Sequence, residues 1–130
     1  MKTANLFDLT GKTALVTGGS RGIGRMIAHG YLQAGATVFI SSRKADACKQ
    51  AADELSTAGP CHALPADISL DADRERLVAA LGERTRQLDV LVNNAGAAWG
   101  APFESFPTTG FRKVLDLNVT ALFFLTRDLT

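Results

Sequence analysis

The sequence predicts an α/β protein in which helices cover both faces of a parallel β-sheet. Segments with strand-like and helix-like spacing of apolar residues alternate along all 130 residues, in the order βαβαβαβα. A glycine-rich turn at 18–24 follows the first strand-like segment and opens the first helix-like one. Because no repeat, low-complexity tract or linker interrupts this alternation, we expect a single domain over 1–130.

Periodicity and turn residues place the individual elements. Gly35 and Gly59 are expected to end the first two helices, and Ser69 is expected to cap the third. The expected strands are 12–17, 37–41, 62–65 and 88–92, and the expected helices are 22–34, 44–58, 69–86 and 108 or 109 to the C-terminus.

The same pattern predicts which side chains face the core. The near-continuous apolar run 88–92 is typical of a strand buried on both faces of a parallel sheet. In the last helix Ala121, Phe123 and Phe124 widen the apolar face, so we expect this helix to contact the sheet and a further surface. The expected inward residues of the four helices are Ile23, Ile27, Tyr31 and Ala34; Cys48, Ala51 or Ala52, and Leu55; Leu77, Val78 and Leu81; and Phe111, Val114, Leu115, Val119, Leu122 and Leu125.

Composition excludes several classes of protein. Lys and Arg (14) nearly balance Asp and Glu (13), so the charge favours neither a nucleic-acid partner nor a membrane surface. The two cysteines and two histidines have no disulfide or metal-ligand spacing, and we expect buried free thiols and no metal site. The charge balance leaves small molecules or other chains as the expected partners. The N-terminus lacks an apolar signal core and no run is long enough to span a bilayer, so we expect a cytoplasmic protein.

The glycine-rich turn indicates the class of ligand. Gly18, Gly22 and Gly24 read Gly-x-x-x-Gly-x-Gly between a strand and a helix, where main-chain N–H groups can bind a dinucleotide pyrophosphate. A nucleoside triphosphate-binding P-loop is excluded, because Arg25 and Met26 stand where its lysine and hydroxyl residue should be. A methyltransferase with a similar sheet fits less well, since its glycine loop holds no phosphate and would not need Arg21 and Arg43 nearby.

The end of the second expected strand indicates which dinucleotide is bound. A fold that prefers NAD places a carboxylate there, whereas this chain has Ser42 and Arg43. Arg43, with Arg21 approaching from the glycine turn, would attract the 2′-phosphate of NADP and hydrogen-bond its oxygens. We therefore expect NADPH (NADP) as cofactor, against the alternative that Arg43 belongs only to a solvated helix start.

With these motifs the chain resembles the short-chain dehydrogenase/reductase family, which implies a Rossmann-type, doubly wound sheet with strand order 3-2-1-4. The resemblance rests on the glycine turn, on Asp67 after the third strand and on Asn93-Asn94-Ala95-Gly96 after the fourth. It implies that Asp67 and Ile68 lie against the adenine, and that the Asn93–Gly96 segment lines the cofactor. The predicted cofactor-binding residues are Gly18, Ser20, Arg21, Gly22, Ile23, Gly24, Ser42, Arg43, Asp67, Ile68, Asn94, Ala95 and Gly96.

The resemblance also implies the reaction, a hydride transfer between nicotinamide and a carbonyl or alcohol. Asn118 matches the asparagine of an Asn-Ser-Tyr-Lys catalytic set; the alternative is an amide that only bonds backbone. The sole tyrosine, Tyr31, is followed four residues later by Gly35 instead of lysine. We therefore expect an incomplete domain, truncated after four strands and the next helix, which carries the cofactor half and is inactive alone.

Finer similarity in 19–28 and 93–101 points to the 3-oxoacyl-(acyl carrier protein) reductase branch, particularly the rhamnolipid-type enzymes. It implies a small-molecule carbonyl substrate such as a 3-oxoacyl thioester. The full-length protein is then expected to form a homodimer or homotetramer. Trp99 and Phe103 could line the near wall of the substrate pocket or merely anchor their loop. The alternative function is a dinucleotide-binding or interaction module without catalysis.

Overall fold

The computed structural model describes residues 3–130; Met1 and Lys2, which belong to the segment assessed for a signal sequence, lie outside the described residues. Its elements are α1 (Thr3–Leu6), β1 (Thr13–Thr17), α2 (Gly22–Gln33), β2 (Thr37–Ser41), α3 (Ala45–Leu55), β3 (Cys61–Ala63), α4 (Asp71–Arg84), β4 (Val90–Val92), the 3₁₀ turn η1 (Phe103–Ser105), α5 (Thr108–Leu115), the π-helical segment η2 (Asp116–Ala121) and α6 (Leu122–Leu129). The predicted α/β alternation is confirmed, and the short α1 is an element that the pattern did not predict.

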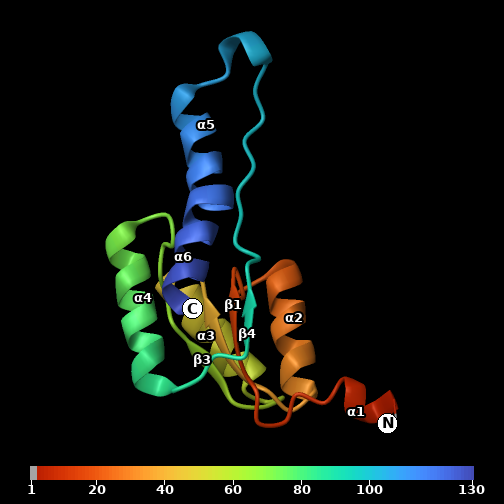
Figure 1. Cartoon of the computed structure of the whole chain (residues 1–130). Coiled ribbons are helices and arrows are strands. Elements are labelled where there is room, and N and C mark those ends of the chain that lie inside the picture. Colours follow the sequence, from red (N-terminus) through yellow and green to blue (C-terminus); the bar gives the residue numbers. More distant parts are fainter. Residues whose placement is uncertain (1–2) are drawn as a thin grey trace.

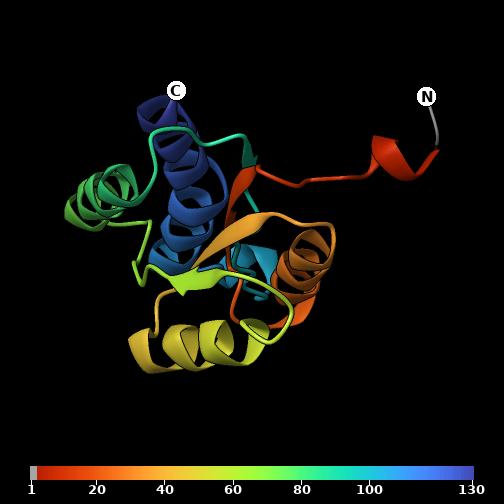
Figure 2. The same cartoon turned by 90° about the horizontal axis from the view of Figure 1, so that it is seen from below.

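The four strands form one parallel sheet in the order β3-β2-β1-β4, as predicted. β1 lies in the middle, pairing Leu15 with Phe39 of β2 and with Leu91 of β4. Helices α2 and α3 cover one face, and α4 and α6 cover the other (Figure 2). Each face has its own apolar core, and the two cores share the central strands β1 and β2.

Helix α2 is rotated relative to the predicted stripe. Its buried residues are Gly24, Ala28 and Leu32, while Ile27 and Tyr31 are only half-buried against the core. Ile23 is 66% exposed, so its assignment to the inward face is wrong. The small side chains at 24 and 28 let the helix approach the sheet closely, and the larger residues lie at the margin of that contact.

The last helical segment also differs from the prediction. The chain from 108 to 129 is one continuous rod whose first half projects beyond the sheet, while α6 lies beside α4 (Figure 1). Ala121 and Leu125 are the only apolar side chains that this rod buries fully, because no sheet lies beneath the projecting half. The expected inward residues Phe111, Leu115, Val119 and Leu122 are therefore exposed.

Two further predictions, the burial of the fourth strand on both faces and the capping of α4 by Ser69, are wrong. β4 is half-buried throughout, because it is the edge strand and pairs only with β1. Ser69 does not cap α4, since its hydroxyl donates to Asp67 Oδ1 at 2.6 Å.

The prediction of free, buried thiols is confirmed. Neither cysteine forms a disulfide, and burial raises the pKa of Cys61 to about 11. None of the helices that the structure describes in residues 3–130 could span a bilayer.

Candidate functional site

The predicted cofactor residues gather at the carboxyl ends of the strands. Gly19 N donates to Ser41 O at 3.3 Å, which joins the glycine turn to the end of β2. Ala66 N donates to Ser42 O at 3.0 Å, which joins the chain after β3 to the same place. Asn94 Nδ2 donates to Gly18 O at 3.2 Å, so the segment after β4 closes the other side. This edge of an open α/β sheet is where such folds bind ligands.

The three motif glycines have distinct geometric roles. Gly18 and Gly22 adopt left-handed φ angles of 64° and 58°, which turn the chain sharply between β1 and α2. A Cβ on Gly24 would lie 2.1 Å from Gly18 O, so this glycine permits close contact between helix and turn. A Cβ on Gly22 would meet no atom within 4 Å, which leaves that side of the turn open.

The N-terminus of α2 is available to an anion. Its N-cap residue, Arg21, makes no side-chain capping bond, and the first turn contains no acidic residue. The first N–H groups of a helix have no intrahelical partner and carry the positive end of the helix dipole. Arg25 is not directed to this position, because its guanidinium pairs with Glu54 of α3 at 2.5 Å. The turn thus offers main-chain donors from Ser20 to Gly24 to a phosphate.

The hydroxyl of Thr17 connects the glycine turn to the segment after β4 by hydrogen bonds, and the sequence motifs did not predict this role. Its hydroxyl accepts the N–H groups of Asn94 and Ala95 at 3.1 Å each and donates to Val92 O at 3.2 Å. The residue is only 1% exposed. A threonine at the end of a strand is common and its partners lie more than 70 residues away, so no signal in the sequence singles out this contact.

We expect Thr17→Val to destabilise the protein by about 2 kcal/mol at unchanged side-chain volume, because the Ala95 N–H loses its acceptor and the Asn94 N–H keeps only the carbonyl of Val92. Urea unfolding of the variant and the wild type measures the difference. Thr17→Ser keeps the hydroxyl and is the matched control, with an expected loss below about 1 kcal/mol. Equal losses for the two variants would show that the methyl group, not the hydroxyl, is the important part of Thr17.

The end of β2 carries the groups predicted to recognise a 2′-phosphate. The Ser42 hydroxyl is buried and, within residues 3–130, has no hydrogen-bond partner. Arg43 and Arg21 are exposed, and neither forms an ion pair with a carboxylate in the described part of the chain. The unpartnered buried hydroxyl of Ser42 and the unpaired guanidinium of the next residue, Arg43, fit an anionic ligand that would accept hydrogen bonds from them, and Arg21 adds an unpaired guanidinium on the glycine turn.

Asp67 shapes the loop after β3 and is held by α4. Its Oδ1 accepts hydrogen bonds from the N–H and the hydroxyl of Ser69, at 3.1 and 2.6 Å. Its own N–H donates to Asp73 Oδ2 at 2.7 Å, a bond that lowers the pKa of Asp73. Ile68 is 5% exposed and packs in the core on the α4 side. Asp67 thus stabilises a turn through its side chain, as the alternative interpretation expects, and its contact with adenine stays a prediction.

Asn118 joins the π-helical segment η2 to the segment after β4. Its Oδ1 accepts the N–H of Ala97 at 2.9 Å, and its Nδ2 donates to the carbonyl of the same residue at 2.8 Å. A Cβ on Gly96 would lie 3.0 Å from Asn118 Oδ1, so the glycine allows this approach. Asn118 is exposed, not enclosed by apolar side chains. Its two hydrogen bonds to the main chain are those expected if the amide only bonds backbone. Its catalytic role stays a prediction.

Trp99 anchors its loop to α5. A Cβ on Gly110 would lie 2.7 Å from the indole, and Lys113 Nζ lies 5.9 Å from the centre of the ring. Trp99 also lines a hollow of about 280 Å³ that reaches Asn118. Phe103 is 92% exposed. Trp99 therefore both anchors its loop and lines this hollow, whereas Phe103 is not among the residues that line it.

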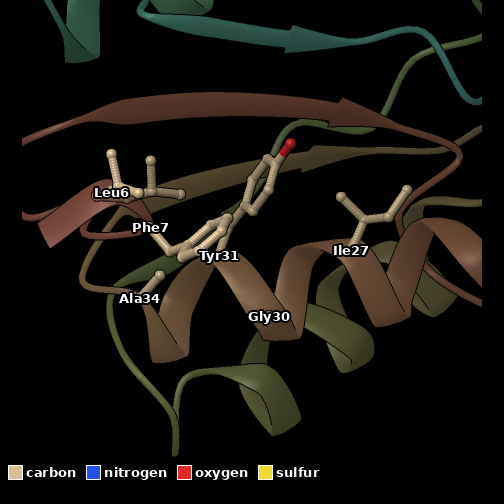
Figure 3. A pocket seen from close by; sticks show the side chains of 7 residues that line it. Leu6, Phe7, Ile27, Gly30, Tyr31 and Ala34 are labelled. Atoms are coloured by element: carbon tan, nitrogen blue, oxygen red, sulfur yellow. The ribbon is translucent and has the colours of Figure 1, made fainter. Parts of the chain in front are cut away.

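A second hollow, of about 500 Å³, lies between the N-terminal segment and α2, and none of its lining residues belongs to the glycine turn (Figure 3). Leu6 and Phe7 from the N-terminal arm and Ile27 from α2 contribute to it, and Tyr31 brings its only side-chain hydroxyl. Because no lining residue is basic, this hollow does not suit a dinucleotide.

Comparisons with known proteins identify the class of protein that this fold and site define. The family model for short chain dehydrogenases matches residues 12–130, so the chain belongs to the short chain dehydrogenase family. The rhamnolipids biosynthesis 3-oxoacyl-[acyl-carrier-protein] reductase of Pseudomonas aeruginosa is 58% identical over 117 residues, which cover 90% of this chain and 46% of that protein.

Two solved structures show the same fold. The Pseudomonas aeruginosa RhlG/NADP active-site complex has a TM-score of 0.92 and 56% identity, and the match covers 95% of this chain and 48% of that one. The L-sorbose reductase of Gluconobacter frateurii, complexed with NADPH and L-sorbose, has a TM-score of 0.90 and 27% identity, with coverages of 95% and 48%. The chain thus spans about half the length of the relatives it matches.

Proposed function

We propose that this chain forms the NADPH-binding half of an oxidoreductase that transfers hydride between nicotinamide and a carbonyl or alcohol. The observation that carries the proposal is the glycine turn, where the uncapped N-terminus of α2 meets an open side at Gly22. The family membership and the NADP and NADPH complexes of two relatives support it.

The residues present fit the parts of the cofactor. The N–H groups from Ser20 to Gly24 would bind the pyrophosphate, and Ser42, Arg43 and Arg21 would hold the 2′-phosphate. Asp67 and Ile68 would contact the adenine. Asn94, Ala95 and Gly96 would line the route toward the nicotinamide. When bound, NADPH supplies the hydride, and these residues bind and orient it so that the reaction occurs at one place.

We also propose that Asn118 serves catalysis as well as structure. Its side chain fixes Ala97, directly beyond the Asn94–Gly96 segment. It therefore connects the wall of the cofactor site with the helix that begins at Thr108. The self-association that we propose for the complete protein is supported by the exposed apolar residues of that helix, such as Phe111 and Phe123.

The substrate that we propose is a 3-oxoacyl thioester. Support comes from the relative that is a 3-oxoacyl-[acyl-carrier-protein] reductase and is 58% identical to this chain. The competing function is a dinucleotide-binding module without catalysis.

Titration calorimetry and a turnover assay on the complete protein test both proposals. We expect NADPH to bind with micromolar affinity or better, and a 3-oxoacyl thioester to be reduced as NADPH is consumed. A ketose and a hydroxysteroid are the comparison substrates, and faster turnover of either would replace the thioester. Binding without turnover of any carbonyl would favour the module, and absence of NADPH binding would overturn both functions.

A further inference from the structure

Arg74, in the second turn of α4, is the one charged residue that is buried in the part of the chain that the structure describes. Only 6% of its side chain is exposed. Removing a guanidinium from water costs free energy that its contacts must offset. An apolar side chain would pack next to Leu77 and Leu81 without that cost, so the charge at this position calls for an explanation.

The Arg74 guanidinium is directed at the loop that follows β3. Its Nη1 donates to the carbonyl of Ile68 at 2.7 Å, and its Nη2 pairs with the carboxylate of Asp71. Asp71 is 88% exposed, so this ion pair alone does not account for a buried partner. The hydrogen bond to Ile68 is the contact that reaches into the protein.

The same loop is held by α4 at a second point. Asp67 donates its N–H to Asp73, while the carbonyl of the next residue, Ile68, accepts from Arg74. The first two turns of α4 therefore fix the backbone on both sides of the Asp67–Ile68 peptide unit. Because both groups are set by one rigid helix, the orientation of this unit depends on α4.

Arg74 also touches the helix that continues from Asn118. Its guanidinium carbon lies 5.4 Å from the centre of the Phe124 ring in α6, and the guanidinium of Arg127 lies 4.6 Å from the same ring. Helices α4 and α6 are neighbours on one face of the sheet (Figure 1). One side chain thus joins the loop after β3 to α6.

We propose that Arg74 is a positioning residue for the adenine end of the dinucleotide site. This inference rests on the proposed function, in which Asp67 and Ile68 contact the adenine. Arg74 does not touch the cofactor itself. By holding the Ile68 carbonyl, it fixes the peptide that presents Asp67 and Ile68, and thereby raises affinity for the adenosine half of the cofactor.

The test compares ligands that represent the two halves of the cofactor, using the complete protein and the variant Arg74→Met. We expect the Kd for 2′,5′-ADP and the Kd for NADPH each to rise about tenfold, the effect of one hydrogen bond to a charged group. The Kd for reduced nicotinamide mononucleotide, which lacks adenosine, should stay within about twofold. A merely structural role would weaken both halves equally or change only the thermal midpoint.

Two further variants make the result decisive. Arg74→Lys keeps a charged donor for the Ile68 carbonyl but loses the forked contact with Asp71, so it should recover part of the affinity that Arg74→Met loses, even if Arg74→Met folds poorly. Arg84→Met, an exposed arginine on the same helix, should bind both ligands as the wild type does. Unchanged 2′,5′-ADP binding in folded Arg74→Met would overturn the inference alone. A wild-type protein that binds no NADPH would instead overturn the proposed function.

Discussion

Gly24→Ala is expected to destabilise the protein by about 3 kcal/mol and to abolish binding of NADPH. The new methyl group would lie 2.1 Å from Gly18 O and 2.5 Å from Asn94 Nδ2. Neither atom can move freely, since both belong to the link between the glycine turn and the end of β4. Relief of the overlap would push α2 away from the turn and misdirect the N–H groups proposed to bind the pyrophosphate.

Chemical unfolding and an NADPH titration measure the two effects. Gly30→Ala, in the same helix, is the matched control, because a Cβ there would meet no atom within 4 Å. That variant should be more stable by about 0.5–1 kcal/mol, as alanine is the better helix former. If Gly24→Ala were as stable as Gly30→Ala and still bound NADPH, the close contact between helix and turn would be unimportant.

Arg43→Ala is expected to weaken NADPH binding about 30-fold, because a phosphate would lose charge-assisted hydrogen bonds worth about 2 kcal/mol. NADH has no 2′-phosphate, so its affinity should change by less than about twofold. The variant therefore separates recognition of the 2′-phosphate from recognition of the rest of the dinucleotide. Titration of the complete protein with each cofactor provides the comparison.

Arg84→Ala controls for the loss of one positive charge. Arg84 is the last residue of α4, and the loop after β3 precedes the first residue of this helix. The variant removes the same charge and should leave both affinities unchanged, since exposed charges at long distance are screened by salt. Equal weakening of NADPH and NADH by Arg43→Ala would assign Arg43 to general attraction of anions. No weakening of either would return it to the solvated start of α3.

Much of the fold could be predicted because its signals are local. The strand at 37–41 and the start of the helix at Gly22 are observed as predicted, since a β-branched run and a glycine turn identify them without distant contacts. The errors concern which side of a helix is buried. Ile23 and Phe111 belong to regular apolar stripes, yet both are exposed, because α2 turns its small residues toward the sheet in place of Ile23 and no sheet lies beneath Phe111.

The candidate site divides in the same way. Gly18, Gly22 and Arg43 are recognisable in the sequence, because glycine spacing and charge at a strand end have direct chemical meaning. The roles of Thr17 and Arg74 were not recognisable. A threonine at a strand end and an arginine in a helix are common residues, and their partners lie elsewhere in the chain.

The sequence by itself determined the order of strands and helices, the position of the glycine turn and the basic character of the chain after β2, because each depends on neighbouring residues. Only the tertiary structure decided that Thr17 bridges two strand ends, that Asn118 bonds Ala97 and that Arg74 holds the Ile68 carbonyl. The physical reason is that a hydrogen bond depends on distance and direction in space. Those are set by how the sheet, α4 and the last helix pack together, and not by spacing along the chain.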